Sequence, residues 1–133
     1  MEKPEYHYLT AKVEQTVLVL TITETRLQEE RVAEALFQEM LKAASQIAVR
    51  KVVVDMRHLE YMSSVAFRPL LRLRGRLQKS GGRMILCGLT PLVGDIFYTT
   101  KMLSSTGAFE APFRMELDVA AAVAQLHHEA GQK

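Results

Sequence analysis

The sequence predicts a single α/β domain: a mostly parallel central sheet, opened by an antiparallel N-terminal hairpin and accompanied by about four helices. Apolar residues alternate with polar ones over two short segments near the N-terminus. Beyond them, helical spacing alternates with short β-branched runs, a pattern whose right-handed crossovers produce parallel strands. The length of 133 residues suits one domain, residues 1–133, with its core at about residues 6–128.

The hairpin is predicted from residues 6–14 and 16–23. Apolar side chains recur there at every second position, which is the period of a strand with one buried face. We expect the buried face to hold Leu9, Ala11, Val13, Leu18, Leu20 and Ile22.

Residues 28–44 change to helical spacing and predict an amphipathic helix that covers the sheet. The segment 51–56 is short, β-branched and almost uninterrupted by polar residues, so we expect a central strand buried on both faces. The apolar side of the helix holds Ala33, Leu36, Phe37, Met40, Leu41 and Ala44.

A second helix is predicted over residues 64–79, ending at the glycines Gly81 and Gly82. Pro69 lies inside this range and lacks the N–H that would bond the Val65 carbonyl. We therefore expect a kinked or irregular first turn.

The next strand is predicted at residues 83–88, followed by a helix that reaches about Met102. Thr90 is expected to cap this helix, with Pro91 at its first position, where a missing N–H is harmless.

The C-terminal part is predicted to hold a short strand at residues 113–115 and a final helix. Asp118 is expected to cap that helix, which is rich in alanine and runs to about His127.

Composition excludes several classes of protein. A net charge of +2 is too small to predict nucleic-acid binding. No apolar run approaches the ~20 residues of a membrane span, and the first residues lack the apolar core of a signal peptide, so we expect a cytoplasmic protein. The one cysteine, Cys87, lies among apolar residues and is expected to be a buried hydrophobic group without a redox role.

The sequence does not predict an enzyme, a metal site or a cofactor. Asp55, His58 and Ser64 are the residue types of a hydrolytic triad, but neither a nucleophile elbow nor a glycine-rich oxyanion loop accompanies them. His127 and His128 are adjacent, so on a helix they point in different directions rather than forming a metal-binding face.

Two stretches carry a resemblance to a known family. In residues 52–64 a strand ends at Asp55 and a loop leads to the serine pair Ser63 and Ser64; in residues 81–91 a glycine turn, a strand and a proline-opened helix follow. In this order the chain resembles the STAS domain family, of the anti-sigma factor antagonist type, over residues 8–126.

The resemblance implies a regulatory role by partner switching. In antagonists an anti-sigma kinase phosphorylates the second serine of the pair, here Ser64, which breaks their complex, and a phosphatase restores it. The physics of a helix start is compatible, because free N–H groups and the helix dipole favour a phosphate there. The plain alternative is that Ser63 or Ser64 only caps the helix.

The neighbours of Ser64 depart from the family pattern. Antagonists usually have aspartate before the serine pair and glycine-leucine after it, where this chain has Met62, then Val65 and Ala66. The acidic residue that lies beside the phosphosite is replaced by Gln28. The expected site therefore comprises Ser64 as phosphoacceptor, with neighbours Asp55, Met62, Ser63 and Gln28.

The second helix carries a basic stripe: Arg68, Arg72, Arg76 and Lys79, spaced so that they share one side. Two interpretations remain open, a solvated face and a docking strip for an acidic partner or an anionic membrane surface. Because Arg72 and Arg76 should point away from the apolar side of this helix, reversing both to glutamate should change stability by less than about 1 kcal/mol under either interpretation.

The favoured hypothesis is a non-catalytic interaction domain that binds an anti-sigma partner with serine kinase activity. One alternative is a STAS subunit of a membrane transport complex that docks on an ATPase subunit. Another is a scaffold component of a stress-signalling assembly. The sequence leaves the oligomeric state open.

Overall fold

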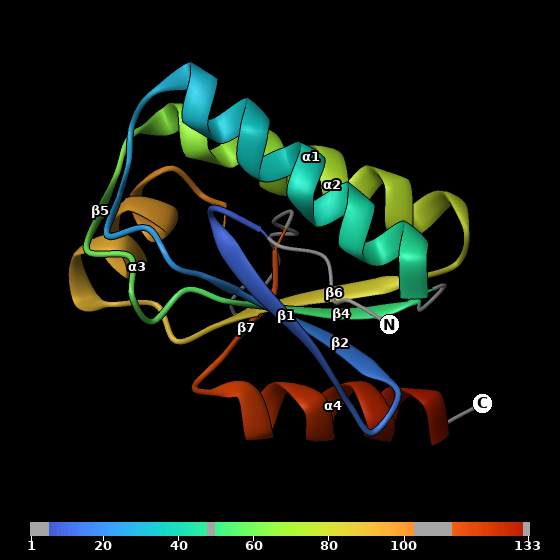
Figure 1. The fold of residues 1–133 in the computed structure, drawn as a ribbon. Coiled ribbons are helices and arrows are strands. Elements are labelled where there is room, and N and C mark those ends of the chain that lie inside the picture. Colours follow the sequence, from blue (N-terminus) through green and yellow to red (C-terminus); the bar gives the residue numbers. More distant parts are fainter. Residues whose placement is uncertain (1–5, 48–49, 103–112, 132–133) are drawn as a thin grey trace.

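A five-stranded sheet in the order β1-β2-β4-β6-β7 forms the centre of the molecule (Figure 1). The computed structural model describes residues 6–47, 50–102 and 113–131. The predicted α/β class, the antiparallel hairpin and the central place of the 51–56 strand are confirmed. The hairpin consists of β1 (Leu9–Glu14) and β2 (Val17–Ile22), and parallel strands follow as β4 (Lys51–Asp55), β6 (Arg83–Cys87) and β7 (Met115–Glu116).

Helices cover both faces of this sheet. Figure 1 shows α1 and α2 side by side on one face and α4 on the other, with α3 near one end of the sheet. A second sheet of two short parallel strands, β3 and β5, was not predicted. The bounds are β3 (Arg26–Leu27), α1 (Glu30–Ile47), β5 (Tyr61–Met62), the 3₁₀ turn η1 (Ser64–Ala66), α2 (Phe67–Lys79), α3 (Pro91–Thr99) and α4 (Val119–Gly131).

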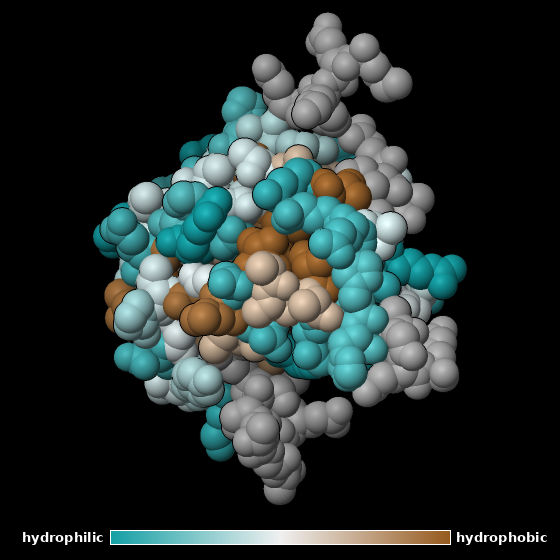
Figure 2. Space-filling model, turned by 90° about the horizontal axis from the view of Figure 1, so that it is seen from below, coloured by the Kyte–Doolittle hydropathy of each residue, from teal (hydrophilic) through white to brown (hydrophobic). Residues whose placement is uncertain are grey.

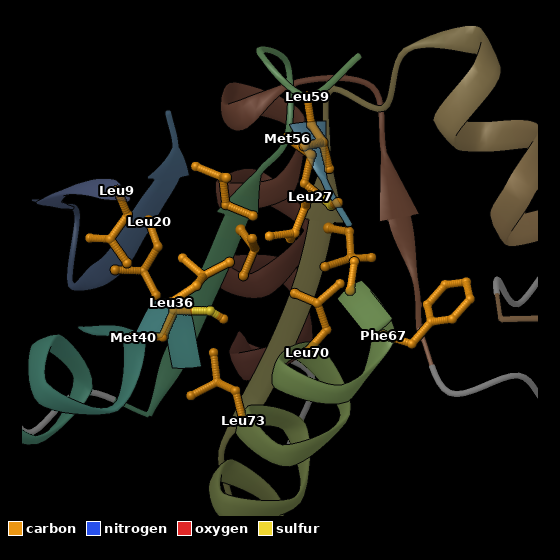
Figure 3. Packing of buried hydrophobic residues seen from close by; sticks show 14 of the residues in the cluster. Leu9, Leu20, Leu27, Leu36, Met40, Met56, Leu59, Phe67, Leu70 and Leu73 are labelled. Carbon is orange, nitrogen blue, oxygen red and sulfur yellow. The ribbon is translucent and has the colours of Figure 1, made fainter. Parts of the chain in front are cut away.

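The larger core lies between the sheet and the α1–α2 layer. Figure 3 shows Leu36 and Met40 from α1 and Leu70 and Leu73 from α2 pointing into this layer. All four are at most 1% exposed. Complete burial of one such side chain contributes about 1.5–3 kcal/mol, so these contacts hold α1 and α2 against the sheet.

The prediction of one buried face for the hairpin was wrong for β2, since all six of its residues are buried. β2 lies between β1 and β4, and α4 covers the face that the sequence pattern left open. Val17 and Val19 therefore pack in a second core with Val123 and Leu126 of α4. Val13, expected to be buried, is 48% exposed near the end of the edge strand β1.

The third helix ends at Thr99, earlier than the predicted Met102. Lys101 has a φ of +61°, and the Met102 N–H donates to the Phe97 carbonyl at 2.8 Å. This left-handed turn stops the helix. Thr90 occupies the predicted cap position, but its hydroxyl donates to the Leu59 carbonyl at 3.1 Å instead of accepting from the helix.

The predicted end of α2 is confirmed. Gly81 has a φ of +77°, and the Gly82 N–H donates to the Leu77 carbonyl at 2.7 Å. The expected irregular first turn is observed, because Ser64–Ala66 form the 3₁₀ turn η1; α2 itself begins at Phe67, which places Pro69 in its first turn. The N–H groups of a first turn have no partner within the helix.

The cap of α4 is also as predicted, with the Asp118 carboxylate accepting from the Ala121 N–H at 2.9 Å. The preceding strand, β7, begins at Met115, two residues later than predicted.

Cys87 is buried, as expected, at the end of β6. Burial, and after it the nearby Asp55 carboxylate, raises the pKa of its thiol to about 12. The thiol is therefore protonated and unreactive at neutral pH.

Candidate functional site

The serine pair lies where the chain leaves β5 and enters the turn before α2. β5 pairs with β3 in the register Leu27 to Met62, and the Ser63 N–H donates to the Leu27 carbonyl at 3.0 Å. This pairing fixes the backbone of the pair and brings Gln28, the residue after Leu27, alongside Ser63. Met62 is 1% exposed and points into the core, as a hydrophobic residue at this position requires.

The two serines differ in access. The Ser63 side-chain oxygen is buried and has no hydrogen-bond partner among the described residues. Ser64, the first residue of η1, is exposed. Only the Ser64 hydroxyl therefore lies open to another protein.

Neither serine caps a helix with its side chain, which corrects the plain alternative from the sequence. The residue that precedes α2 is Ala66, and Ser63, which precedes η1, makes no side-chain cap. The Phe67 N–H instead bonds the carbonyls of Ser64 and Val65. The 3₁₀ turn separates Ser64 from the α2 N-terminus, so the helix start does not occupy its hydroxyl.

The carboxylate of Asp55 is committed to the turn after β4. It accepts from the Arg57 N–H at 3.1 Å and lies 3.3 Å from the Arg57 guanidinium, with the Thr21 hydroxyl 3.5 Å away. Its side chain is only 3% exposed. Asp55 thus supports the strand end, and its recorded contacts do not reach Ser64.

The Asp55 side chain also lies on the α4 side of the sheet, away from the α1–α2 layer. It lines a hollow of about 770 Å³ that α4 flanks, together with Arg57 and the exposed Ala120 and Ala124. Figure 2, which looks onto the α4 side, shows apolar surface in the middle of this face with hydrophilic surface around it.

The predicted basic stripe divides into two halves. Arg68 faces Glu30 of α1 at 3.6 Å, and Arg72 faces Glu34 of α1 at 2.6 Å. Arg72 also lies over the ring of Phe37, 3.9 Å from its centroid. The first half therefore links α1 to α2, whereas Arg76 and Lys79 have no carboxylate partner among the described residues.

The acidic partners of this link were missed by sequence reasoning. Glu30 and Glu34 are four residues apart, as are Arg68 and Arg72, so each pair shares one side of its helix. This matched spacing would have indicated two ion pairs if the packing of α1 on α2 had been known. The pKa of the Glu34 carboxyl is lowered, first by a hydrogen bond from Gln38 and then by Arg72.

A hollow of about 390 Å³ lies beside the serine turn, between α1 and α2. Val65 and Pro69 provide its apolar wall. The charges around it include the two ion pairs, which largely neutralise each other. The surface next to Ser64 is thus concave, partly apolar and of low net charge, which suits a protein contact.

The ion pair and the ring contact of Arg72 revise the small stability change expected from the sequence, because the two halves of the stripe should respond differently to charge reversal. Arg72→Glu is expected to lower the free energy of unfolding by about 1–2 kcal/mol, because it removes the Glu34 pair and the Phe37 contact and sets two carboxylates side by side. Arg76→Glu, the matched control, should change it by less than about 0.5 kcal/mol. Urea unfolding of the two variants measures the difference, and equal midpoints would show that the Arg72 contacts contribute nothing.

Residues 8–122 match the STAS domain family. A central sheet that begins with a hairpin, and four helices in the described residues, are what the sequence resemblance implied. The chain belongs to the STAS domain family.

Part of the chain matches a relative whose name refers to sigma-factor regulation. BtrV of Bordetella bronchiseptica, named as an anti-sigma factor antagonist, is 36% identical over 55 residues, covering 41% of this chain and 47% of BtrV. The match thus spans about half the length of that relative.

Solved structures share the fold. An RsbS variant from Moorella thermoacetica matches with a TM-score of 0.73 at 16% identity, covering 95% of this chain and all of that one. Unphosphorylated SpoIIAA matches at 0.70 and 18%, covering 90% and 96% of the two chains. The phosphorylated form of Bacillus SpoIIAA matches at 0.62 and 18%, covering 89% and 98%.

None of the helices in the described part of the chain has both the length and the apolar character needed to cross a membrane.

Proposed function

We propose that this chain is a cytoplasmic, non-catalytic regulatory domain that works as an anti-sigma factor antagonist. Its Ser64 end binds an anti-sigma partner with serine kinase activity, phosphorylation of Ser64 breaks the complex, and a phosphatase restores it. The difference in access within the serine pair carries the proposal: the Ser64 side chain is exposed and the Ser63 hydroxyl is buried. A kinase that approaches this turn meets one acceptor.

The electrostatics of the turn support a switch. A phosphate adds a charge of about −1.5 to −2 at neutral pH. Arg68 is four residues further on, but its side chain is 60% exposed and 3.6 Å from Glu30, an ion pair of small stabilising effect. A phosphate can therefore compete for this arginine and leave Glu30 unpaired. In either arrangement a nearly neutral surface gains negative charge without disturbance of the core.

The relatives support the same function. BtrV is named as an anti-sigma factor antagonist, and SpoIIAA adopts this fold in both an unphosphorylated and a phosphorylated form. The departures at Met62 and Gln28 leave fewer carboxylates beside the acceptor. We propose that the kinase of this system recognises the apolar wall of Val65 and Pro69 where other kinases meet acidic groups.

Phosphate mapping tests the acceptor. Incubation with the cognate kinase and ATP should add one phosphate to the parent chain and to Ser63→Ala, and none to Ser64→Ala. Peptide mass spectrometry locates the phosphate, and circular dichroism confirms that both variants fold. A phosphate on another residue, with an active kinase, would exclude Ser64 as the switch.

A further inference from the structure

The charges of this chain are unevenly distributed. Residues 41–51 and 73–83 contain none of its 15 acidic residues and seven of its 17 basic ones. The described parts of these two segments, residues 41–47, 50–51 and 73–83, meet at one end of the molecule, where α1 and α2 end and where β4 and β6 begin (Figure 1). We name this end the basic pole; its basic residues are Lys42, Arg50, Lys51, Arg74, Arg76, Lys79 and Arg83.

A hollow of about 340 Å³ opens in the basic pole. Its apolar lining comes from Leu41 on α1 and from Leu73 and Leu77 on α2, and its rim carries Arg50 and Arg76. Both arginines are exposed. The surface thus combines a concave apolar floor with two cations at its edge.

The framework of the hollow is rigidly built. The Arg83 N–H donates to the Arg50 carbonyl at 2.7 Å, which ties the start of β6 to the residue before β4. Gly82 permits this approach, since a Cβ there would lie 2.5 Å from the Arg50 carbonyl oxygen. The backbone of Arg50 is therefore hydrogen-bonded to the start of β6, and Arg76 lies within α2.

Carboxylates of neighbouring elements are already engaged. Glu39 accepts from the N–H groups of His7 and Tyr8 at 2.8 and 2.9 Å, and Glu14 pairs with Lys12 at 3.5 Å. Neither Arg50 nor Arg76 has a carboxylate partner in the described part of the chain, in contrast to Arg68 and Arg72. Among the described residues, the positive charges of Arg50 and Arg76 are thus left without a compensating carboxylate.

We propose that the basic pole is a second docking surface, for an acidic segment of a partner protein that places an apolar side chain in the hollow between Arg50 and Arg76. Charge complementarity requires acidic groups on the partner, which steer association and pair with the two arginines. The apolar floor of the hollow requires an apolar side chain on the partner as the buried anchor. This proposal does not depend on Ser64, which lies at the other end of the α2 segment.

The shape of the pole favours a protein over the other anionic partners. A membrane surface is met by protruding apolar side chains, whereas here the apolar side chains line a depression. Protein surfaces that bind single-stranded nucleic acid commonly present aromatic rings for base stacking, and residues 41–51 and 73–83 contain no aromatic residue.

Two matched peptides test the proposal on the full chain. Both are acidic and of equal charge, and one carries leucines where the other carries serines. The leucine peptide should perturb amide NMR signals of residues 41–45, 50 and 73–80 and should bind at least about tenfold more tightly than the serine peptide. Arg50→Glu and Arg76→Glu should each weaken it by about tenfold, whereas Arg31→Glu, an exposed arginine of the α1 first turn, changes net charge equally and should retain binding.

The remaining arms separate the alternatives. Ser64→Glu should bind the leucine peptide as the parent does, so this test is independent of the phosphoswitch. Equal affinity for both peptides, or signals that move elsewhere, would overturn the proposal. Binding of phosphatidylglycerol vesicles with no binding of either peptide would overturn it in favour of a lipid surface.

Discussion

Val53→Asp is expected to unfold most of the protein at 25 °C. Val53 is fully buried at the middle of the central strand and packs in the α4-side core with Val123 and Leu126. A carboxylate there loses its hydration and gains no cation, which costs several kcal/mol, comparable to the whole stability of a small domain. Val13→Asp is the matched control, because Val13 is 48% exposed on β1 and should lose less than about 1 kcal/mol.

Circular dichroism during urea unfolding checks this prediction. The Val53 variant should show little native signal before denaturant is added, and the Val13 variant should unfold near the parent midpoint. Similar curves for the two variants would contradict the place of Val53 in the core.

The order of elements could be predicted because its signals are local. Three neighbouring valines, Val52 to Val54, indicate a strand buried on both faces, and Gly81 marks the end of a helix without any knowledge of its neighbours. The same holds for Asp118, whose carboxylate caps α4 as expected. Each of these depends on residues within one or two turns of chain.

Other features depend on tertiary contacts and could not be predicted. β3 and β5 have two residues each, too few for a periodic pattern. Their pairing nevertheless positions the backbone of the serine turn, since the Ser63 N–H donates to the Leu27 carbonyl. β2 is buried on both faces because α4 packs against its second face. The alternation of Leu18 and Leu20 gives no information about the position of α4.

The candidate site was predicted in part. Sequence resemblance placed Ser64 at the start of a helix, whereas the structure separates it from α2 by a 3₁₀ turn. The spacing of the basic stripe was visible in the sequence. The sequence did not show which of these arginines form ion pairs. Glu30 and Glu34 are 38 residues from Arg68 and Arg72 and become their partners only when α1 packs on α2.

Ser64→Glu is expected to weaken binding of the anti-sigma partner by about a hundredfold. A carboxylate buried without a partner at a protein interface costs about 2–5 kcal/mol, and a hundredfold corresponds to about 2.7 kcal/mol. The exposed side chain of Ser64 means that this variant should fold normally. Gln78→Glu, near the far end of α2, adds the same charge and should bind like the parent.

Calorimetric titration of the anti-sigma partner with one sample of the chain, before phosphorylation, after it and after phosphatase treatment, tests the switch most directly. The account predicts tight binding, then a loss of at least about a hundredfold, then recovery to the first affinity, while Ser64→Ala stays tight throughout. Equal affinity before and after complete phosphorylation of Ser64 would contradict the central claim.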